Sequence, residues 1–159
     1  MNDSLLTLKP VTDADVELVE KWLYEEHVLK WYHDTDEWLK EIKERNGAFG
    51  FLHHFIVNQV DKPIGFCQYY DCFDAQEEWY SVESRGKIFS IDYLIGEKDF
   101  LRKGFGKQII KLLIDEISKE HQHFEIVVQP ETENTASNKT LLASGFIYDE
   151  TKQYYISRI

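Results

Sequence analysis

In the first third of the chain, hydrophobic residues first alternate with polar ones, as in a strand, and then recur at helical spacing. Leu5–Lys9 alternates apolar and polar positions, which predicts a strand. Beyond Thr12, a good helix N-cap, apolar residues recur every three or four positions, which predicts three helices. The last of these helices is expected over Thr35–Gly47. The helical spacing of Trp22 and Trp38 predicts that both pack in the core.

The middle of the chain is rich in β-branched and aromatic residues. Phe51–Val60 and Ile64–Phe73 are predicted strands, joined by a turn at Asp61–Pro63. Residues 74–87 are polar and are expected to form a long loop or a strand extension. Ile88–Ile95 is a third strong strand, so the middle of the chain predicts consecutive strands without a helix between them.

The C-terminal half alternates helices with strands. A broad apolar face after Gly104–Gly106 predicts a helix, and Phe124–Val128 predicts a strand. Asn134 is expected to cap a further helix that Gly145 ends, and residues 148–156 suggest a closing hairpin. The order β-α-α-α-β-β-β-α-β-α-β-β predicts a mixed α/β fold with a helix-flanked sheet of about six or seven strands.

Composition narrows the class of protein. The 159 residues suit a single domain, 1–159, and a hydrophobic content of 43% argues against a disordered chain. The net charge of −11 argues against nucleic acid or an anionic membrane as a partner. Cys67 and Cys72, expected on one strand, complete no metal pattern, and no apolar run approaches the roughly 20 residues that span a bilayer. We therefore expect a cytoplasmic protein with reduced thiols and no bound metal, either a monomer or a homodimer.

The sharpest local signal is a glycine-containing loop between a strand and a helix. Leu101–Lys107 follows the strand Ile88–Ile95 and leads into the next predicted helix. Glycines let a ligand approach the backbone, and the first helical turn offers free N–H groups to an anion. From Lys98 to Lys107 four basic residues oppose one acidic residue, a local charge of +3. The spacing matches neither a P-loop nor a dinucleotide fingerprint. The loop predicts a phosphate site, and its alternative is a tight turn alone.

These segments resemble the GCN5-related N-acetyltransferases over essentially the whole chain. Ile91–Gly96 with Gly104–Gly106 resembles the motif of that family that binds the pyrophosphate of acetyl-CoA. Asn134–Ser137 through Ser144–Phe146 resembles its second motif, in the same order. Short motifs shared with the aminoglycoside 6'-N-acetyltransferase branch are Trp22-Leu23, His27-Val28, Trp31-Tyr32, Pro63–Tyr70, and Glu77 with Trp79-Tyr80 followed by Asp92.

The resemblance implies acetyl-CoA as the cofactor and assigns residues to it. Backbone N–H groups near Tyr93–Ile95 would hold the pantetheine arm and polarise the thioester carbonyl, and those of Lys103–Lys107 would hold the pyrophosphate. Asn134 would contact or brace the pantetheine arm, and Lys139 would reach the 3'-phosphate. The implied cofactor-binding residues are Tyr93, Leu94, Ile95, Lys103, Gly104, Phe105, Gly106, Lys107, Asn134 and Lys139.

Asp92 is the candidate catalytic carboxylate, because it interrupts an apolar strand just before the expected cofactor segment. A carboxylate there attracts an ammonium ion and accepts its proton directly or through water. Strand alternation alone equally allows Asp92 to point to solvent. Aromatic faces and carboxylates suit a cationic acceptor, and the candidate acceptor-binding residues are Trp31, Tyr32, Glu77, Trp79, Tyr80 and Asp92.

Two positions depart from the family pattern. Leu141 stands where many members carry a tyrosine that protonates the leaving thiolate, and Tyr93 and Tyr148 are both open as substitutes. Gln129 precedes Pro130 where relatives often carry an aspartate that holds an aminoglycoside ammonium. The acceptor therefore stays open.

The resemblance implies direct acetyl transfer in a ternary complex, from acetyl-CoA to the primary amine of a cationic small molecule, with the 6'-amine of an aminoglycoside as one candidate. Other acceptors are a protein or peptide N-terminus, a polyamine or a siderophore hydroxylysine. A different class of function is an acyl-CoA-binding module without catalysis.

Overall fold

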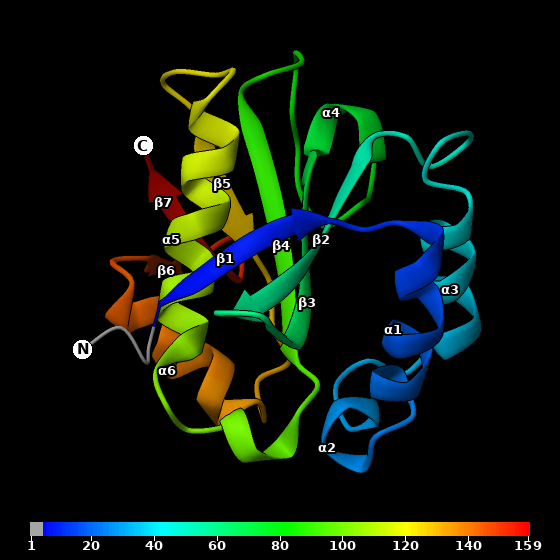
Figure 1. The fold of residues 1–159 in the computed structure, drawn as a ribbon. Helices are drawn as coiled ribbons and strands as arrows, with labels where there is room; N and C mark the ends of the chain where they lie inside the picture. The colour runs from blue at the N-terminus through cyan, green and yellow to red at the C-terminus, as the bar shows by residue number, and fades with distance from the viewer. Residues whose placement is uncertain (1–4) are drawn as a thin grey trace.

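Seven strands form one twisted sheet in the order β1-β2-β3-β4-β5-β7-β6 (Figure 1). The structure is a computed structural model that describes residues 5–159. Neighbouring strands are antiparallel except β4 and β5, which run parallel, so the predicted mixed sheet is confirmed. The strands are β1 (Leu6–Pro10), β2 (Leu52–Gln59), β3 (Lys62–Asp71), β4 (Ile88–Ile95), β5 (Glu125–Val128), β6 (Ile147–Asp149) and β7 (Tyr154–Arg158).

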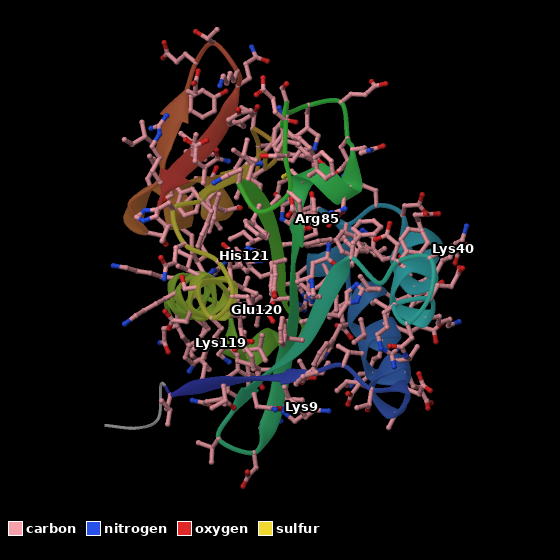
Figure 2. The ribbon with its side chains drawn as sticks, turned by 90° about the horizontal axis from the view of Figure 1, so that it is seen from above. Lys9, Lys40, Arg85, Lys119, Glu120 and His121 are labelled. Carbon is pink, nitrogen blue, oxygen red and sulfur yellow. The ribbon has the colours of Figure 1, made fainter. Side chains whose placement is uncertain are left out.

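Helices cover both faces of this sheet (Figure 1). They are the 3-10 turns η2 (Asp13–Asp15) and η3 (Lys98–Phe100) and the helices α1 (Val16–Leu23), α2 (Glu26–Leu29), α3 (Thr35–Lys43), α4 (Cys72–Ala75), α5 (Phe105–Ser118) and α6 (Thr135–Ala143). Seen from above, α5 and α1–α3 lie on opposite sides of the central strands (Figure 2). Within residues 5–159, no helix has the length and apolar character needed to cross a membrane.

Strand alternation divides the core between the two faces. On β2, Phe55 and Val57 pack with the apolar side of α5, whereas Ile56 packs with α1 and α3. Trp22 is fully buried in the second cluster, as predicted, and Trp38 is partly buried at its edge. Because successive residues of a strand point to opposite faces, each central strand presents one set of side chains to α5 and another to α3.

The sheet splits between its two parallel strands. Pairing joins β4 to β5 only at Ile88 with Glu125 and at Phe89 with Ile126. The hydroxyl of Ser90 then donates to the carbonyl of Val127 at 2.6 Å, while β4 continues to Ile95. The second half of β4 therefore has an edge that faces the gap instead of a strand.

Three local predictions were wrong at the ends of elements. β3 ends at Asp71 because this side chain accepts the N–H groups of Phe73 at 2.9 Å and Gly86 at 2.6 Å, which turns the chain into α4. Cys72 therefore begins a helix instead of sharing the strand of Cys67. The third helix ends at Lys43, and turns fill residues 44–51.

The predicted caps are confirmed. Thr12 is the N-cap of η2, where it forms a capping box with Asp15, and η2 leads directly into α1. Asn134 caps α6 by accepting the N–H of Ser137 at 3.2 Å. Gly145 ends α6 in the left-handed conformation, with φ of 92°, which costs glycine little.

Candidate functional site

One cleft of about 1220 Å³ crosses the molecule at the split between β4 and β5. Its lining comes from the α2–α3 connection, α3, β3, the segment after α4, β4, the loop before α5 and the β5–α6 loop. Along β4, Asp92 faces the α3 side and Tyr93 faces the α5 side, as strand alternation requires. The cleft therefore has two halves that meet along this strand.

Asp92 lies on the α3 side of the strand along which the two halves meet. Its carboxylate is half-buried, and Oδ2 accepts a hydrogen bond from Nε2 of Gln68 at 2.8 Å. Burial raises the pKa of Asp92 to about 6, with Glu77 contributing in the same direction and the Gln68 hydrogen bond opposing it. A carboxyl with this pKa is mostly ionised above pH 7 and still close enough to neutrality to take and release a proton.

Acidic and aromatic side chains line the same cleft as Asp92. Trp31, Tyr32, Glu77 and Trp79, all singled out in the sequence, line the cleft. Glu77 is held in place because its Oε1 accepts a hydrogen bond from the hydroxyl of Tyr70 at 2.8 Å. Tyr80 lies behind these side chains: it is buried outside the lining, and its hydroxyl accepts the N–H of Glu77 at 3.1 Å.

Sequence reasoning missed Glu41, a half-buried residue of α3 that lines the cleft. Burial raises the pKa of Glu41 to about 7, and Glu37 and Asp92 add to the shift. It also missed the place of Trp38, which lines the cleft and contacts Tyr32 edge-to-face with ring centroids 5.0 Å apart. Asp34, Glu37, Trp38 and Glu41 recur at helical spacing, and this stripe was the available signal.

The open edge of β4 presents backbone groups to the gap. The hydroxyl of Tyr32 donates to the carbonyl of Tyr93, and a ring nitrogen of His27, Nε2, lies 2.8 Å from the carbonyl of Ile95. The N–H and C=O of a strand residue point to the same side, so the N–H groups of Tyr93 and Ile95 also face the gap. Tyr32 and His27 fix this edge from the N-terminal helices.

The α5 half of the cleft has the features of an anion site. Gly104 precedes α5 with φ of 76°, and no side chain caps the first turn, whose N–H groups are free to face a ligand. Gly106 allows Thr140 and Tyr93 to pack close to the helix, since a Cβ there would lie 3.1 Å from Cγ2 of Thr140 and 3.2 Å from the hydroxyl of Tyr93, whereas a Cβ at Gly104 would meet nothing within 4 Å. Gly104, Phe105 and Gly106 line the cleft together with Leu94 and Asn134.

Three of the predicted cofactor-binding residues lie outside this lining. Lys103 and Lys107 are exposed beside the start of α5, and Lys139 is exposed on α6. Their long side chains suit contact with charged groups near the surface of the protein better than with atoms deep in the cleft.

The structure distinguishes Tyr93 from Tyr148, the two tyrosines that the sequence offered as possible proton donors to the leaving thiolate. Tyr93 lines the α5 half of the cleft, and burial raises its pKa. Tyr148 is 43% exposed on β6, packs edge-to-face against Tyr155, and lies outside the lining. Leu141 is fully buried in the core and presents nothing to the cleft.

Known proteins match this chain over most of its length. A family model described as "Acetyltransferase (GNAT) domain" matches residues 11–153. Aminoglycoside N(6')-acetyltransferases type 1 of Klebsiella pneumoniae and of Serratia marcescens are each 22% identical over 151 residues, which covers 91% of this chain and 75% of the relative.

Solved structures share the fold. The aminoglycoside acetyltransferase AAC(6')-Ib in complex with coenzyme A superposes with a TM-score of 0.82 at 20% identity, over 96% of this chain and 94% of that chain. The aminoglycoside N(6')-acetyltransferase of Legionella pneumophila gives 0.73 at 20% identity, over 97% and 91% of the two chains.

Proposed function

This chain belongs to the GNAT acetyltransferase family, and from that premise we propose that it transfers the acetyl group of acetyl-CoA to the primary amine of a cationic small molecule. Transfer is direct, with both substrates bound at once. The observation that carries the proposal is the position of Asp92, a half-buried carboxylate where an acidic, aromatic half-cleft meets an anion-binding half-cleft. The names of the curated relatives make the 6'-amine of an aminoglycoside the first acceptor to test.

The α5 half fits acetyl-CoA, which supplies the activated acetyl group when bound. The uncapped first turn of α5 and the open space beside Gly104 suit a pyrophosphate, which is anionic and needs close backbone approach. We assign the pyrophosphate to the backbone of Lys103–Lys107 and the 3'-phosphate to Lys139. We assign the pantetheine arm to Asn134 and to the open edge of β4.

The α3 half holds the acceptor. Asp92 attracts its ammonium group and removes a proton, directly or through one water, to leave a nucleophilic amine. The N–H groups on the open edge of β4 polarise the thioester carbonyl, because they face the gap where the two half-clefts meet. Holding both substrates in this geometry supplies a large part of the rate. The thiol is a good leaving group, so departure needs no strong acid.

Gln129 departs from the pattern that the family resemblance implies for the acceptor side of the cleft. Gln129 supplies an amide, and its Nε2 donates to the carbonyl of Gln153 at 3.0 Å. Glu131 and Glu133 follow it and line the cleft, so carboxylates are still present in the β5–α6 loop. These carboxylates support a polycationic acceptor.

The test follows the release of free CoA from acetyl-CoA with kanamycin-like aminoglycosides, polyamines and peptides with free N-termini as acceptors. Turnover is expected with a small polycation, and Asp92→Asn should lower kcat/KM by roughly 10²- to 10⁴-fold. Asp99→Asn, an exposed change outside the cleft lining, is the control. Absence of turnover with the whole panel would remove the proposed activity and favour a non-catalytic acyl-CoA-binding module. Equal turnover by the Asp92→Asn variant would remove only the role of Asp92.

A further inference from the structure

A row of polar side chains crosses three strands and ends at Asp92. His54 of β2 pairs in register with Gln68 of β3, and Gln68 pairs with Asp92 of β4. All three point to the face that packs against α1 and α3. His54 is only 5% exposed and Gln68 only 2%, although apolar residues such as Phe66 fill this face. Buried polar groups are costly unless they are paired, so the row calls for a physical explanation.

The direction of the first hydrogen bond fixes the amide of Gln68. Nε2 donates to Oδ2 of Asp92 at 2.8 Å, since a carboxylate only accepts. The carbonyl oxygen Oε1 must then point elsewhere, and it is buried without a hydrogen-bond partner. Both ring nitrogens of His54 are also buried without a partner. His54 on β2, the residue in register with Gln68, therefore has a ring nitrogen available to pair with Oε1.

His54 can supply the hydrogen-bond donor that Oε1 of Gln68 lacks. Burial lowers its pKa to about 4, and Arg45 and His53 lower it further, while Gln68 raises it. A neutral imidazole carries one N–H donor and one acceptor nitrogen, so His54 can offer a proton to Oε1 of Gln68. Leaving both groups buried and unpaired is costly, and a hydrogen bond between them would remove that cost.

We propose that Gln68 is a positioning residue for Asp92 and that His54 orients Gln68, by donating an imidazole N–H to Oε1 while the amide donates to the carboxylate. Gln68 lines the cleft and His54 lies behind it, and the role that we propose for both acts through Asp92. The inference rests on the proposed function for the catalytic value of Asp92, but the hydrogen-bond row itself does not.

The hydrogen bond from Gln68 lowers the pKa of Asp92, whereas burial and Glu77 raise it. Glu77, from the segment after α4, is a negative charge that disfavours the ionised form of Asp92, and ionised Asp92 in turn raises the pKa of Glu41 on α3. Tyr70 of β3 and Tyr32 of the α2–α3 connection also lie close enough to interact with its charge, and both are neutral at ordinary pH. A hydrogen bond donated to the carboxylate favours ionisation. Without Gln68, the pKa of Asp92 should rise from about 6, and a larger fraction of Asp92 should be protonated at neutral pH.

The kinetic experiment measures kcat/KM against pH for four variants. Gln68→Met keeps the length of the side chain without its amide and should move the acid limb of the profile up by about one pH unit, with activity recovering near pH 9. His54→Leu should move it less in the same direction, and His54→Gln, which restores an N–H donor, should reverse the change. His53→Leu is the matched control, because His53 is exposed on the other face of β2 and stacks on Tyr69 at 4.4 Å.

A second readout does not need turnover. The ¹³C carboxyl resonance of Asp92, assigned with the Asp92→Asn variant, gives its pKa in each protein. A higher pKa in Gln68→Met or in His54→Leu, with reversal in His54→Gln, supports the proposal. An unchanged pKa in the folded variants, or an equal loss of activity at every pH, overturns it. If the wild-type protein acetylates no amine, the proposed function fails and the titration still decides the positioning role. If Gln68→Met does not fold, the two His54 variants decide it.

Discussion

Replacing Asp92 by asparagine should stabilise the protein at alkaline pH even as it removes activity. The pKa of Asp92 rises from 3.8 to about 6 on folding. Roughly 1.4 kcal/mol for each pH unit of difference makes the ionised carboxylate cost about 3 kcal/mol of folding free energy. The sign follows from linkage: the stability associated with protonated Asp92 is fully present below about pH 3.8 and is lost as pH rises through about 6. Asparagine is neutral throughout, and its carbonyl still accepts from Gln68.

Urea denaturation of both proteins at pH 5 and at pH 8 measures this difference. The Asp92→Asn variant should be more stable at pH 8 by about 2–3 kcal/mol, and the advantage should shrink by roughly half or more at pH 5. The control Asp99→Asn changes an exposed carboxylate and should leave stability unchanged at both pH values. An Asp92→Asn variant of equal or lower stability at pH 8 would refute the assigned electrostatic cost of Asp92.

Three further changes test other parts of the molecule. Glu41→Gln should raise KM for a cationic acceptor roughly three- to fivefold at pH 8, with kcat unchanged, and the effect should fade at pH 6 because the pKa of Glu41 is about 7. Gly96→Ala would place a Cβ 2.1 Å from Cγ of the fully buried Trp22, so the free energy of unfolding measured with urea should fall by roughly 3 kcal/mol. Lys103→Gln combined with Lys107→Gln should raise KM for acetyl-CoA and weaken its dependence on salt, measured by initial rates.

Each of these changes has a matched control. Glu44→Gln alters an exposed carboxylate outside the cleft lining, and Gly47→Ala meets only the carbonyl of Glu44, at 3.7 Å. Lys40→Gln removes a lysine from the outer side of α3, away from the sheet (Figure 2). A change of KM in Glu41→Gln that is equal at pH 6 and pH 8, an unaffected stability of Gly96→Ala, or equal salt dependence of all lysine variants would contradict the corresponding structural reasoning.

The sequence was sufficient for most of the fold because its periodic patterns are strong and local. The helix after Gly104 and the strand at Ile88–Ile95 each follow from apolar spacing and flanking residues. The break at Asp71 was missed because a side-chain hydrogen bond to Phe73 ends an otherwise apolar strand. Such a turn competes with strand geometry and leaves little trace in hydrophobic periodicity.

The sequence pointed to candidate site residues that lie within a recognisable motif. It did not reveal those that come together only when distant segments meet in the fold. Glu41 lies in a charged stretch typical of a solvent-exposed helix, and only the placement of α3 over the sheet makes that face a cleft wall. The row of His54, Gln68 and Asp92 depends on the register of three strands. β2 and β3 shift register between Val57 and Asn58, so counting residues from the turn misaligns the pairs.

The alternation of Asp92 and Tyr93 along one strand bears on how this protein can diverge. Changes in α3 and in the segment after α4 would reshape the α3 half of the cleft, which we propose holds the acceptor, and would leave the α5 half intact. The two halves can therefore vary independently during evolution or in directed selection for new amines. The strand itself has no such freedom, since inserting or deleting one residue in β4 before Asp92 would exchange the two faces at once. Insertions and deletions should accordingly be compatible with folding in the segment of residues 74–87 and should disrupt the fold within β4.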